Sequence, residues 1–277
     1  MVTLTRTVPS AVLAIFAPLL VSGCRLGDAH SVTPSADWVL VWEDTFDGAA
    51  GSRPSSAWSA DTGGDGWGNA QLEYDTDRVE NAALDGQGHL AITAREEAYQ
   101  GRRYTSARLK TQGHVEPTYG RVEARLKLPP GRGLWPAFWM LGANFGTAGW
   151  PGCGEIDIME ARGQEPAVSH GSLHGPGYSG GAAVTKAYTL PSGTFTGDFH
   201  TFAVEWDQAS LTYFVDDTAY QTVTKESLLG GPWVFDHPFF VILNLAVGGN
   251  YVGSPDTSTS FPQSMLVDWV RVFEHAK

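Results

Sequence analysis

Apolar and polar residues alternate with a period of two over many short segments of the chain. In the segment 120–128, charged side chains at positions 121, 123, 125 and 127 alternate with apolar ones, as a half-buried strand requires. Similar short strands are predicted at 38–42, 89–94, 107–112, 136–142, 155–160, 199–206, 211–215, 239–247 and 265–273. No long helical pattern competes with them, although residues 225–230 could form one turn. Short strands at this density, separated by Gly, Pro and Asp, predict an all-β sandwich or jelly roll.

The strand pattern has no composition break and no internal repeat after Trp38. A chain of 277 residues with 42% hydrophobic residues can bury one sizeable core, so we expect one continuous domain over 38–277. At the N-terminus, Arg6 precedes an apolar run that is broken by prolines and is too short for a normal membrane span. This pattern predicts a signal peptide over 1–24. Residues 25–37 are small and polar and predict a flexible linker.

The apolar run ends in the sequence VSGC at 21–24, which resembles the lipobox of bacterial lipoproteins, where the Cys is lipidated. We therefore expect export, either as a cell-surface lipoprotein attached to the membrane through Cys24 or by plain secretion. The other cysteine is Cys153. If Cys24 is lipidated or removed, no intrachain disulfide can form. Cys153 lacks an evident base partner, and we interpret it as structural.

Composition and charge restrict the class of ligand. The formal net charge of -12 and the pI of 5.0 oppose binding to nucleic acid, because the field of the protein would repel phosphates. The chain has 10 Trp, 9 Tyr and 13 Phe. Some of these rings belong to the core, and others offer flat apolar faces that suit the C–H faces of sugar rings. A neutral, sugar-like substrate is favoured.

Three carboxylates occur within six residues of an otherwise apolar strand: Glu155, Asp157 and Glu160. Charged groups are rarely buried without partners, and like charges packed together raise one another's pKa. In this way a carboxyl group stays protonated near neutral pH and can act as a general acid. The alternatives are a solvated acidic edge or a calcium ligand cluster. The apolar residues at 156, 158 and 159 indicate a buried strand and favour the catalytic interpretation.

The segment EIDIME at 155–160 resembles the signature of glycoside hydrolase family 16, and more narrowly of its bacterial laminarinase-like endo-β-1,3-glucanases. Flanking matches are WGNAQLEY at 67–74, TSARLKT at 105–111, YGRVEARLKLP at 119–129, LWPAFWML at 134–141, SLHGPGYSGG at 172–181 and FHTFAVEW at 199–206. The resemblance covers about 38–275. It implies a β-jelly-roll sandwich of two curved antiparallel sheets with an open substrate cleft on the concave face.

The resemblance also implies the reaction: endo-acting, retaining hydrolysis of β-1,3-glucan of the laminarin or curdlan type, without a cofactor for catalysis. By this resemblance Glu155 is the nucleophile and Glu160 the acid/base. Asp157 would hydrogen-bond the nucleophile and titrate together with both glutamates. The alternatives are a mixed-linkage β-1,3-1,4-glucanase, an enzyme for agar or carrageenan, and a non-catalytic glucan-binding protein of the same fold. We expect a monomer.

Counting along the carboxylate strand predicts an irregularity. Side chains of a regular strand alternate, so Glu155 and Asp157 would face one side while Glu160 faced the other. Such an arrangement cannot catalyse. A β-bulge at Ile158-Met159 absorbs one extra residue and returns Glu160 to the face of Glu155. Relatives that act on mixed-linkage glucan typically lack the residue equivalent to Met159, so the bulge favours the laminarinase-like interpretation.

Aromatic residues near the motif are candidate substrate contacts. Trp135 and Trp139 lie four residues apart and share a strand face; the matching residues in the family line the minus subsites, and a core role is the alternative. Trp150 matches a tryptophan at the cleft rim. His174 is expected beside Glu160, with ordinary packing as the alternative. The spacing of His170 and His174 does not indicate a zinc site, because the glycines and proline around them disfavour a helix.

Two polar residues match family positions that hydrogen-bond glucose hydroxyls. These are Asn69 and Arg108. The alternatives are a turn residue for Asn69 and a surface ion pair for Arg108. The chain departs from the family pattern nearby: relatives often have Glu where this chain has Gln71, and Gln where it has Glu73. We therefore carry over no substrate contact from the family at these two positions.

A structural calcium ion is a further expectation. Asp268 interrupts a strand that looks buried on both faces, and a buried carboxylate needs a compensating partner. Many family members bind one calcium on the convex side, and the matching positions are Asp268, Gly88 and Glu43. Ligation by oxygen alone fits calcium. An arginine partner for Asp268 is the alternative.

Overall fold

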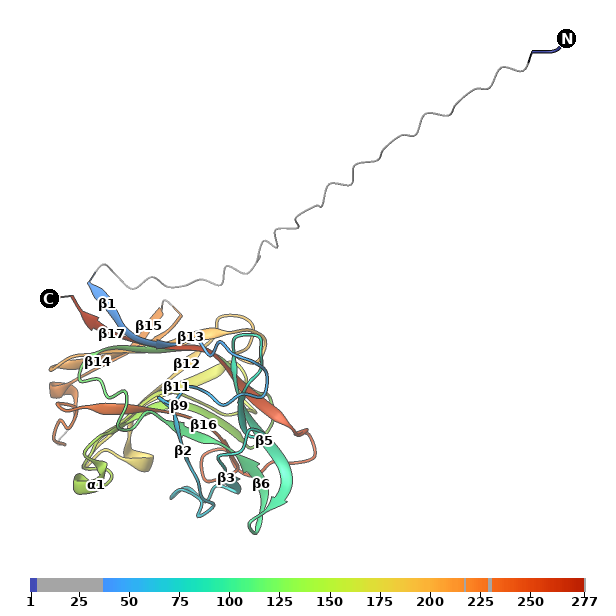
Figure 1. Ribbon diagram of the computed structural model, residues 1–277. Coiled ribbons are helices and arrows are strands. Elements are labelled where there is room, and N and C mark those ends of the chain that lie inside the picture. Colours follow the sequence, from blue (N-terminus) through green and yellow to red (C-terminus); the bar gives the residue numbers. More distant parts are fainter. Residues whose placement is uncertain (4–36, 217, 229–230, 277) are drawn as a thin grey trace. The chain divides into compact units, whose positions relative to one another are not determined.

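The predicted strands assemble into two sheets in a computed structural model that describes residues 1–3, 37–216, 218–228 and 231–276 (Figure 1). The segment Pro34–Lys277 forms one compact unit, and its first strand begins at Trp38. The predicted signal peptide, the lipobox at Cys24 and the linker up to residue 36 lie outside the described residues. Among the described residues, no helix is long and apolar enough to span a membrane.

The first sheet has ten strands. Eight of them follow the order β15 (Thr218–Thr224), β14 (Ser210–Val215), β13 (His200–Trp206), β8 (Gly120–Lys127), β17 (Gln263–His275), β5 (Leu90–Tyr99), β6 (Arg102–Ser106) and β3 (Glu73–Asp75). In addition, β1 (Trp38–Asp44) pairs with β17, and β4 (Ala82–Leu84) pairs with β5. The pairs of this sheet are antiparallel apart from β3 with β6.

The second sheet has seven antiparallel strands in the order β12 (Val184–Thr189), β11 (Val168–His174), β10 (Glu155–Ala161), β9 (Leu134–Gly142), β16 (Phe239–Val247), β7 (Arg108–Lys110) and β2 (Ser59–Asp61). The helical elements of the described residues are short: α1 (Phe145–Ala148) and the 3₁₀ turns η1 (Gly180–Ala182) and η2 (Lys225–Ser227). The last of these lies within the turn predicted at 225–230. The two-layer architecture confirms the predicted all-β jelly roll.

Each predicted strand is present, whereas seven further strands escaped the pattern. These are β2, β3, β4, β6, β11, β12 and β15. Three of them are only three residues long, and the others are rich in Ser, Thr, His or Gly, so their alternation of apolar and polar residues is weak. These strands form because their backbones hydrogen-bond to neighbouring strands, which is an effect of tertiary structure and not of the local sequence pattern.

One main core lies between the sheets, and alternate residues of each strand enter it. On β9, Leu134, Phe138 and Met140 are fully buried there. The prediction of a half-buried β8 is wrong for its first two charged residues, because Arg121 and Glu123 are only 4% and 1% exposed. Arg121 donates to Glu123 at 2.8 Å and to Glu205 at 2.9 Å. The charges are buried because they compensate one another.

Candidate active site

The face of the seven-stranded sheet that points away from the main core, here called the outer face, holds the carboxylate trio. On β10, the apolar residues at 156, 158 and 159 are fully buried in the main core. Glu155, Asp157 and Glu160 point the other way. β10 therefore contributes apolar packing to the core from one face and three acid groups to the outer face.

A β-bulge in β10 makes this separation possible. Against β9, Asp157 pairs with Trp139, but Met159 pairs with Phe138, so one residue is inserted between them. The ladder with β11 shifts in the same interval, between Asp157 and Glu160. The predicted bulge at residues 158–159 is therefore confirmed. It places Glu160 on the same face as the other two carboxyl groups.

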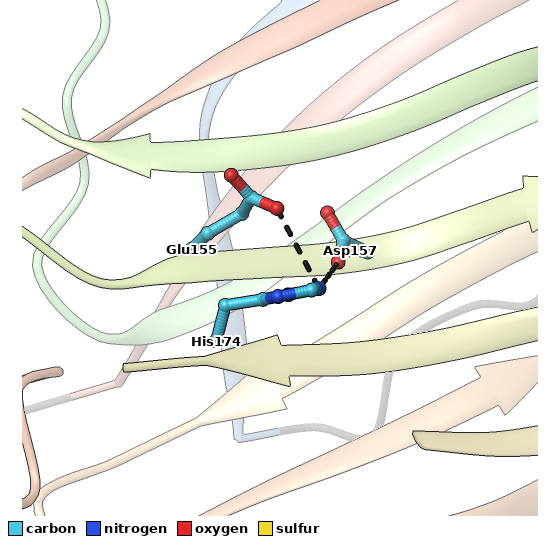
Figure 2. A group of neighbouring side chains, drawn as sticks. All are labelled: Glu155, Asp157 and His174. Carbon is cyan, nitrogen blue, oxygen red and sulfur yellow. Dashed lines mark ion pairs between the residues drawn. The ribbon is translucent and has the colours of Figure 1, made fainter. Parts of the chain in front are cut away.

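His174 joins the trio from the neighbouring strand β11 (Figure 2). Its Nε2 lies 2.9 Å from Asp157 Oδ2 and 3.6 Å from Glu155 Oε1. Asp157 Oδ2 has no hydrogen-bond partner among the described residues, so the ring lies close to this oxygen without a well-aligned hydrogen bond. The indole N–H of Trp150 donates to Glu155 Oε2 at 3.1 Å. Trp150 is 47% exposed, as a residue at a rim would be.

The same three groups have the composition of a metal site, since their ligand atoms lie within 4.8 Å of one another. Their hydrogen bonds argue against one. The backbone N–H of Gly180 donates to His174 Nδ1 at 3.1 Å. Nδ1 is therefore the unprotonated nitrogen, and the neutral ring carries its proton on Nε2, which faces the carboxylates. A metal ion would need Nε2 free and Nδ1 as the donor, so these residues fit proton chemistry better than a metal.

The other end of the trio is held by an indole. Trp135 Nε1 donates to Glu160 Oε1 at 2.9 Å, and the ring is 8% exposed. Trp139 lies on the same outer face, and its N–H donates to Asn244 Oδ1 at 2.8 Å. Trp135 is thus both well buried and in contact with the candidate acid/base. Trp139 keeps more of its surface exposed.

Burial dominates the electrostatics of the trio. It raises the pKa of Glu155 to about 8, and the charge of Asp157 raises it further. The same two causes raise the pKa of Glu160 to about 8. Burial also raises the pKa of Asp157 to about 8, against a hydrogen bond with Glu155 that lowers it. The trio therefore retains part of its protons at neutral pH. An ionised nucleophile and a protonated acid can then coexist in one site.

Arg108 lies on the outer face between two indole rings. Its guanidinium carbon is 4.7 Å from the ring centroid of Trp67 and 4.6 Å from that of Trp139. Its Nε donates to Asp61 Oδ2 at 3.3 Å, so the ion-pair alternative is realised at the sheet face itself. Asn69 is exposed in the segment between β2 and β3. Sequence reasoning did not single out Trp67, although it lies in a segment that carried the resemblance.

Gln71 and Glu73, where the chain departs from the family pattern, are both buried. Glu73 is 0% exposed and its Oε2 accepts from the N–H of Val247 at 2.8 Å. Burial raises the pKa of Glu73 to about 7. Burial, followed by the charge of Glu73, raises the pKa of nearby Asp75 well above its usual range. Position 73 is therefore a buried acid in the protein interior.

The positions expected to bind calcium have other partners. Arg125 donates to Asp268 Oδ2 at 2.5 Å, which is the arginine alternative. Arg271 donates to Glu43 Oε2 at 3.3 Å. Gly88 has a positive φ of 88°. Calcium binding at Asp268 would require its pair with Arg125 to open. The ion remains a prediction.

Two carboxyl groups lie on the outer face of a β-jelly roll, where Trp150 donates to Glu155 and Trp135 donates to Glu160. Paired carboxyl groups of this kind are the arrangement by which a glycoside hydrolase acts. The model of "Glycosyl hydrolases family 16" matches residues 68–271, and the chain belongs to this family. A beta-glucanase of Rhodothermus marinus is 43% identical over 260 residues, which cover 91% of this chain and 90% of that protein.

Two solved structures have the same fold at similar identity. The laminarinase catalytic domain from Thermotoga maritima has a TM-score of 0.82 and 47% identity, covering 87% of this chain and 100% of that chain. The endo-β-1,3-glucanase from Pyrococcus furiosus has a TM-score of 0.82 and 49% identity, covering 87% of this chain and 95% of that chain. The similarity thus extends over nearly the whole described domain.

Proposed function

We propose that this family 16 enzyme cleaves β-1,3-glucan chains internally with retention of configuration. In the first step, a Glu155 carboxylate oxygen attacks the anomeric carbon while Glu160 protonates the leaving glycosidic oxygen, and the glycosidic bond breaks. In the second step, Glu160 removes a proton from water. The water oxygen then attacks the anomeric carbon and displaces Glu155. Each glutamate ends the cycle in its starting protonation state.

The observation that carries this proposal is the bulge in β10. It brings the acid/base to the face of the nucleophile with one residue more than plain alternation needs, and that extra residue is typical of the laminarinase-like branch. The relatives named above are a beta-glucanase, a laminarinase and an endo-β-1,3-glucanase. Mixed-linkage β-1,3-1,4-glucan is the second candidate substrate, since the trio would act on either linkage.

The surroundings of the trio also suit a neutral polysaccharide. The indoles of Trp139, Trp67 and Trp150 present aromatic surface on or beside the outer face, and Arg108 supplies donors between two of them. Aromatic rings stack on sugar faces, while directed donors select hydroxyl positions. The net charge of -12 disfavours sulfated galactans as substrates.

The proposal is tested with Glu155→Ser and Glu160→Ala, each expected to lower turnover on laminarin by about 10²-fold or more. The melting temperature should change little, because both groups are acids buried at an energetic cost. Glu96→Ala, at an exposed side chain of β5, is the matched control and should keep full activity. Proton NMR of early products should show the β-anomer first. An α-anomer appearing first would contradict the retaining mechanism, and preferential cleavage of lichenan would favour the second substrate.

The supporting proposals concern location and assembly. We propose that the protein is exported and acts as a monomer, with Cys24 as an attachment point to the membrane. The lipobox-like segment supports attachment. An exported position would also give the enzyme access to polysaccharides that are too large to enter a cell.

A further inference from the structure

Tyr251, in the segment between β16 and β17, contacts two residues that flank Glu160. Its ring lies 4.9 Å from that of Trp135, centroid to centroid. Its hydroxyl oxygen lies 2.9 Å from His170 Nδ1. Trp135 donates to Glu160 Oε1, and His170 is the cross-strand partner of Glu160 on β11. Tyr251 therefore contacts both neighbours of the candidate acid/base.

The segment that carries Tyr251 is anchored to the seven-stranded sheet and its connections. Gln164, just beyond β10, donates from Nε2 to the carbonyl of Val252 at 2.9 Å. The N–H of Gly248 donates to the carbonyl of Gly133 at 2.7 Å, next to the start of β9. The guanidinium carbon of Arg162 lies 4.3 Å from the Tyr251 ring centroid. The Tyr251 ring therefore lies between Arg162, which follows Glu160 in the sequence, and Trp135, which precedes it.

Protonation states favour the contact between Tyr251 and His170. Burial, followed by the charge of Glu160, raises the pKa of the Tyr251 phenol. Burial and the charge of Arg162 lower the pKa of His170. A protonated phenol is a donor and a neutral imidazole offers an acceptor nitrogen, so the hydroxyl can donate to Nδ1. At neutral pH the contact is therefore a hydrogen bond from the phenol to the imidazole.

We propose that Tyr251 is a positioning residue for Glu160, acting through Trp135 on one side and His170 on the other. The inference rests on the proposed function, in which Glu160 transfers a proton. Trp135 occupies Oε1 of Glu160, which leaves Oε2 to carry the proton that moves to the glycosidic oxygen. If the Tyr251 ring is lost, the Trp135 indole is free to tilt and water can enter beside the carboxyl group.

The experiment measures kcat, KM and pH profiles on laminarin for Tyr251→Phe and Tyr251→Leu. We expect kcat to fall by about 3-fold for the Phe variant and about 30-fold for the Leu variant, with KM changed by less than about 2-fold, because proton transfer depends on geometry. Water entering the Leu variant lowers the pKa of Glu160. The alkaline limb of its kcat profile should move down by about half a pH unit.

The variant Arg162→Gln should shift the pKa of Glu160 in the opposite direction. The titratable and charged groups around Glu160 are Asp157, His174, His170, Tyr251 and Arg162. Of these, Asp157 raises the pKa of Glu160 and Arg162 lowers it. Removing this cation should move the alkaline limb to higher pH. Tyr99→Phe is the matched control for a tyrosine, because Tyr99 also lies under an arginine, 4.6 Å from Arg78, but on β5 of the other sheet. Its kinetics should equal those of the wild type.

The outcomes separate this inference from the proposed function. An inactive wild type would overturn both. An active wild type whose Tyr251 variants keep the wild-type kcat, or lose activity only in proportion to a lower melting temperature with an unmoved pH profile, would overturn the positioning role alone. Circular dichroism of each variant identifies loss of fold, and the Phe variant keeps the ring in place if the Leu variant does not fold.

Discussion

Replacing Glu73 by Gln should stabilise the protein at neutral and alkaline pH. In the unfolded chain this carboxyl group ionises near pH 4.5, whereas in the folded protein burial raises its pKa to about 7. As pH rises from 4.5 to 7, the unfolded chain gives up its proton first, so folding becomes progressively less favourable. Below pH 4.5 both states are protonated, and the destabilisation is absent. At and above pH 7 it is fully present.

The magnitude follows from the size of the pKa change. A rise from 4.5 to about 7 corresponds to about 3 kcal/mol at ~1.4 kcal/mol per unit. The carboxyl group is 0% exposed, so solvent screening does not reduce this figure. An uncharged amide of the same shape keeps the acceptor for the Val247 N–H and removes the charge beside Asp75. The pKa of Asp75 should then fall, because the charge of Glu73 is one of the causes that raise it.

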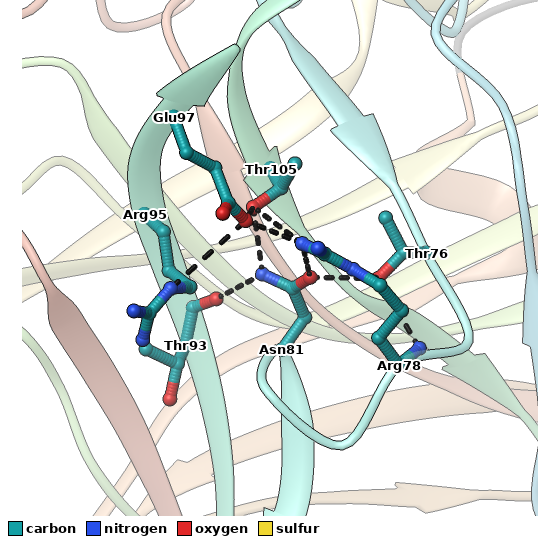
Figure 3. Close-up of polar contacts among 7 residues, drawn as sticks. All are labelled: Thr76, Arg78, Asn81, Thr93, Arg95, Glu97 and Thr105. Atoms are coloured by element: carbon teal, nitrogen blue, oxygen red, sulfur yellow. Dashed lines mark hydrogen bonds and ion pairs between the residues drawn. The ribbon is translucent and has the colours of Figure 1, made fainter. Parts of the chain in front are cut away.

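A cluster of hydrogen bonds ties the segment after β3 to the neighbouring strands (Figure 3). Thr76, directly after β3, donates to Asn81 Oδ1 at 2.7 Å, and Asn81 donates to Thr105 Oγ1 at 3.0 Å. Arg78 pairs with Glu97 across the same cluster. These bonds join the segment after β3 to β5 and β6. Because these bonds hold the segment after β3 in place, we expect the raised pKa of Glu73 to persist in solution.

The assay is denaturation by guanidinium at pH 4.5 and at pH 8, for wild type and Glu73→Gln. The variant should be more stable at pH 8 by up to about 3 kcal/mol, which is roughly 2–4 °C in Tm for each kcal/mol. At pH 4.5 the two proteins should differ little. Glu80→Gln, at an exposed side chain, is the control and should show no such pH dependence. An identical difference at both pH values, or a variant less stable at pH 8, would refute the reasoning.

Two further predictions concern calcium and export. If calcium binds at Asp268, a chelator should lower the melting temperature while activity at moderate temperature persists, because these residues lie away from the trio and a ligand that binds only the folded state stabilises it; an unchanged melting temperature in calcium and in chelator would favour the pair with Arg125. In the native cell the protein should partition with membranes and Cys24→Ala should release or misprocess it; wild-type protein found wholly in the medium, with an unmodified N-terminus beyond Cys24, would favour plain secretion.

Local rules sufficed for ten of the strands and for the geometry of β10. Alternation is a property of neighbouring residues, so it predicted the ten clearest strands and required a bulge before Glu160. The three carboxyl groups of the trio also indicated acid/base chemistry from the sequence alone, because burying three such groups in one apolar strand is energetically costly. The seven missed strands have weak patterns, and their existence depends on hydrogen bonds offered by a neighbouring edge.

Tertiary structure alone decided which side chains meet around these elements. Arg125 and Asp268 are 143 positions apart, and Tyr251 and His170 are 81 apart, so no local pattern links them. The burial of Glu73, Arg121 and Glu123 likewise depends on strands that are distant in sequence. The sequence determined each strand's faces because side-chain direction is a local property of the backbone. The partners were decided by the register of the sheets, because contact between distant residues exists only after the ladders have formed.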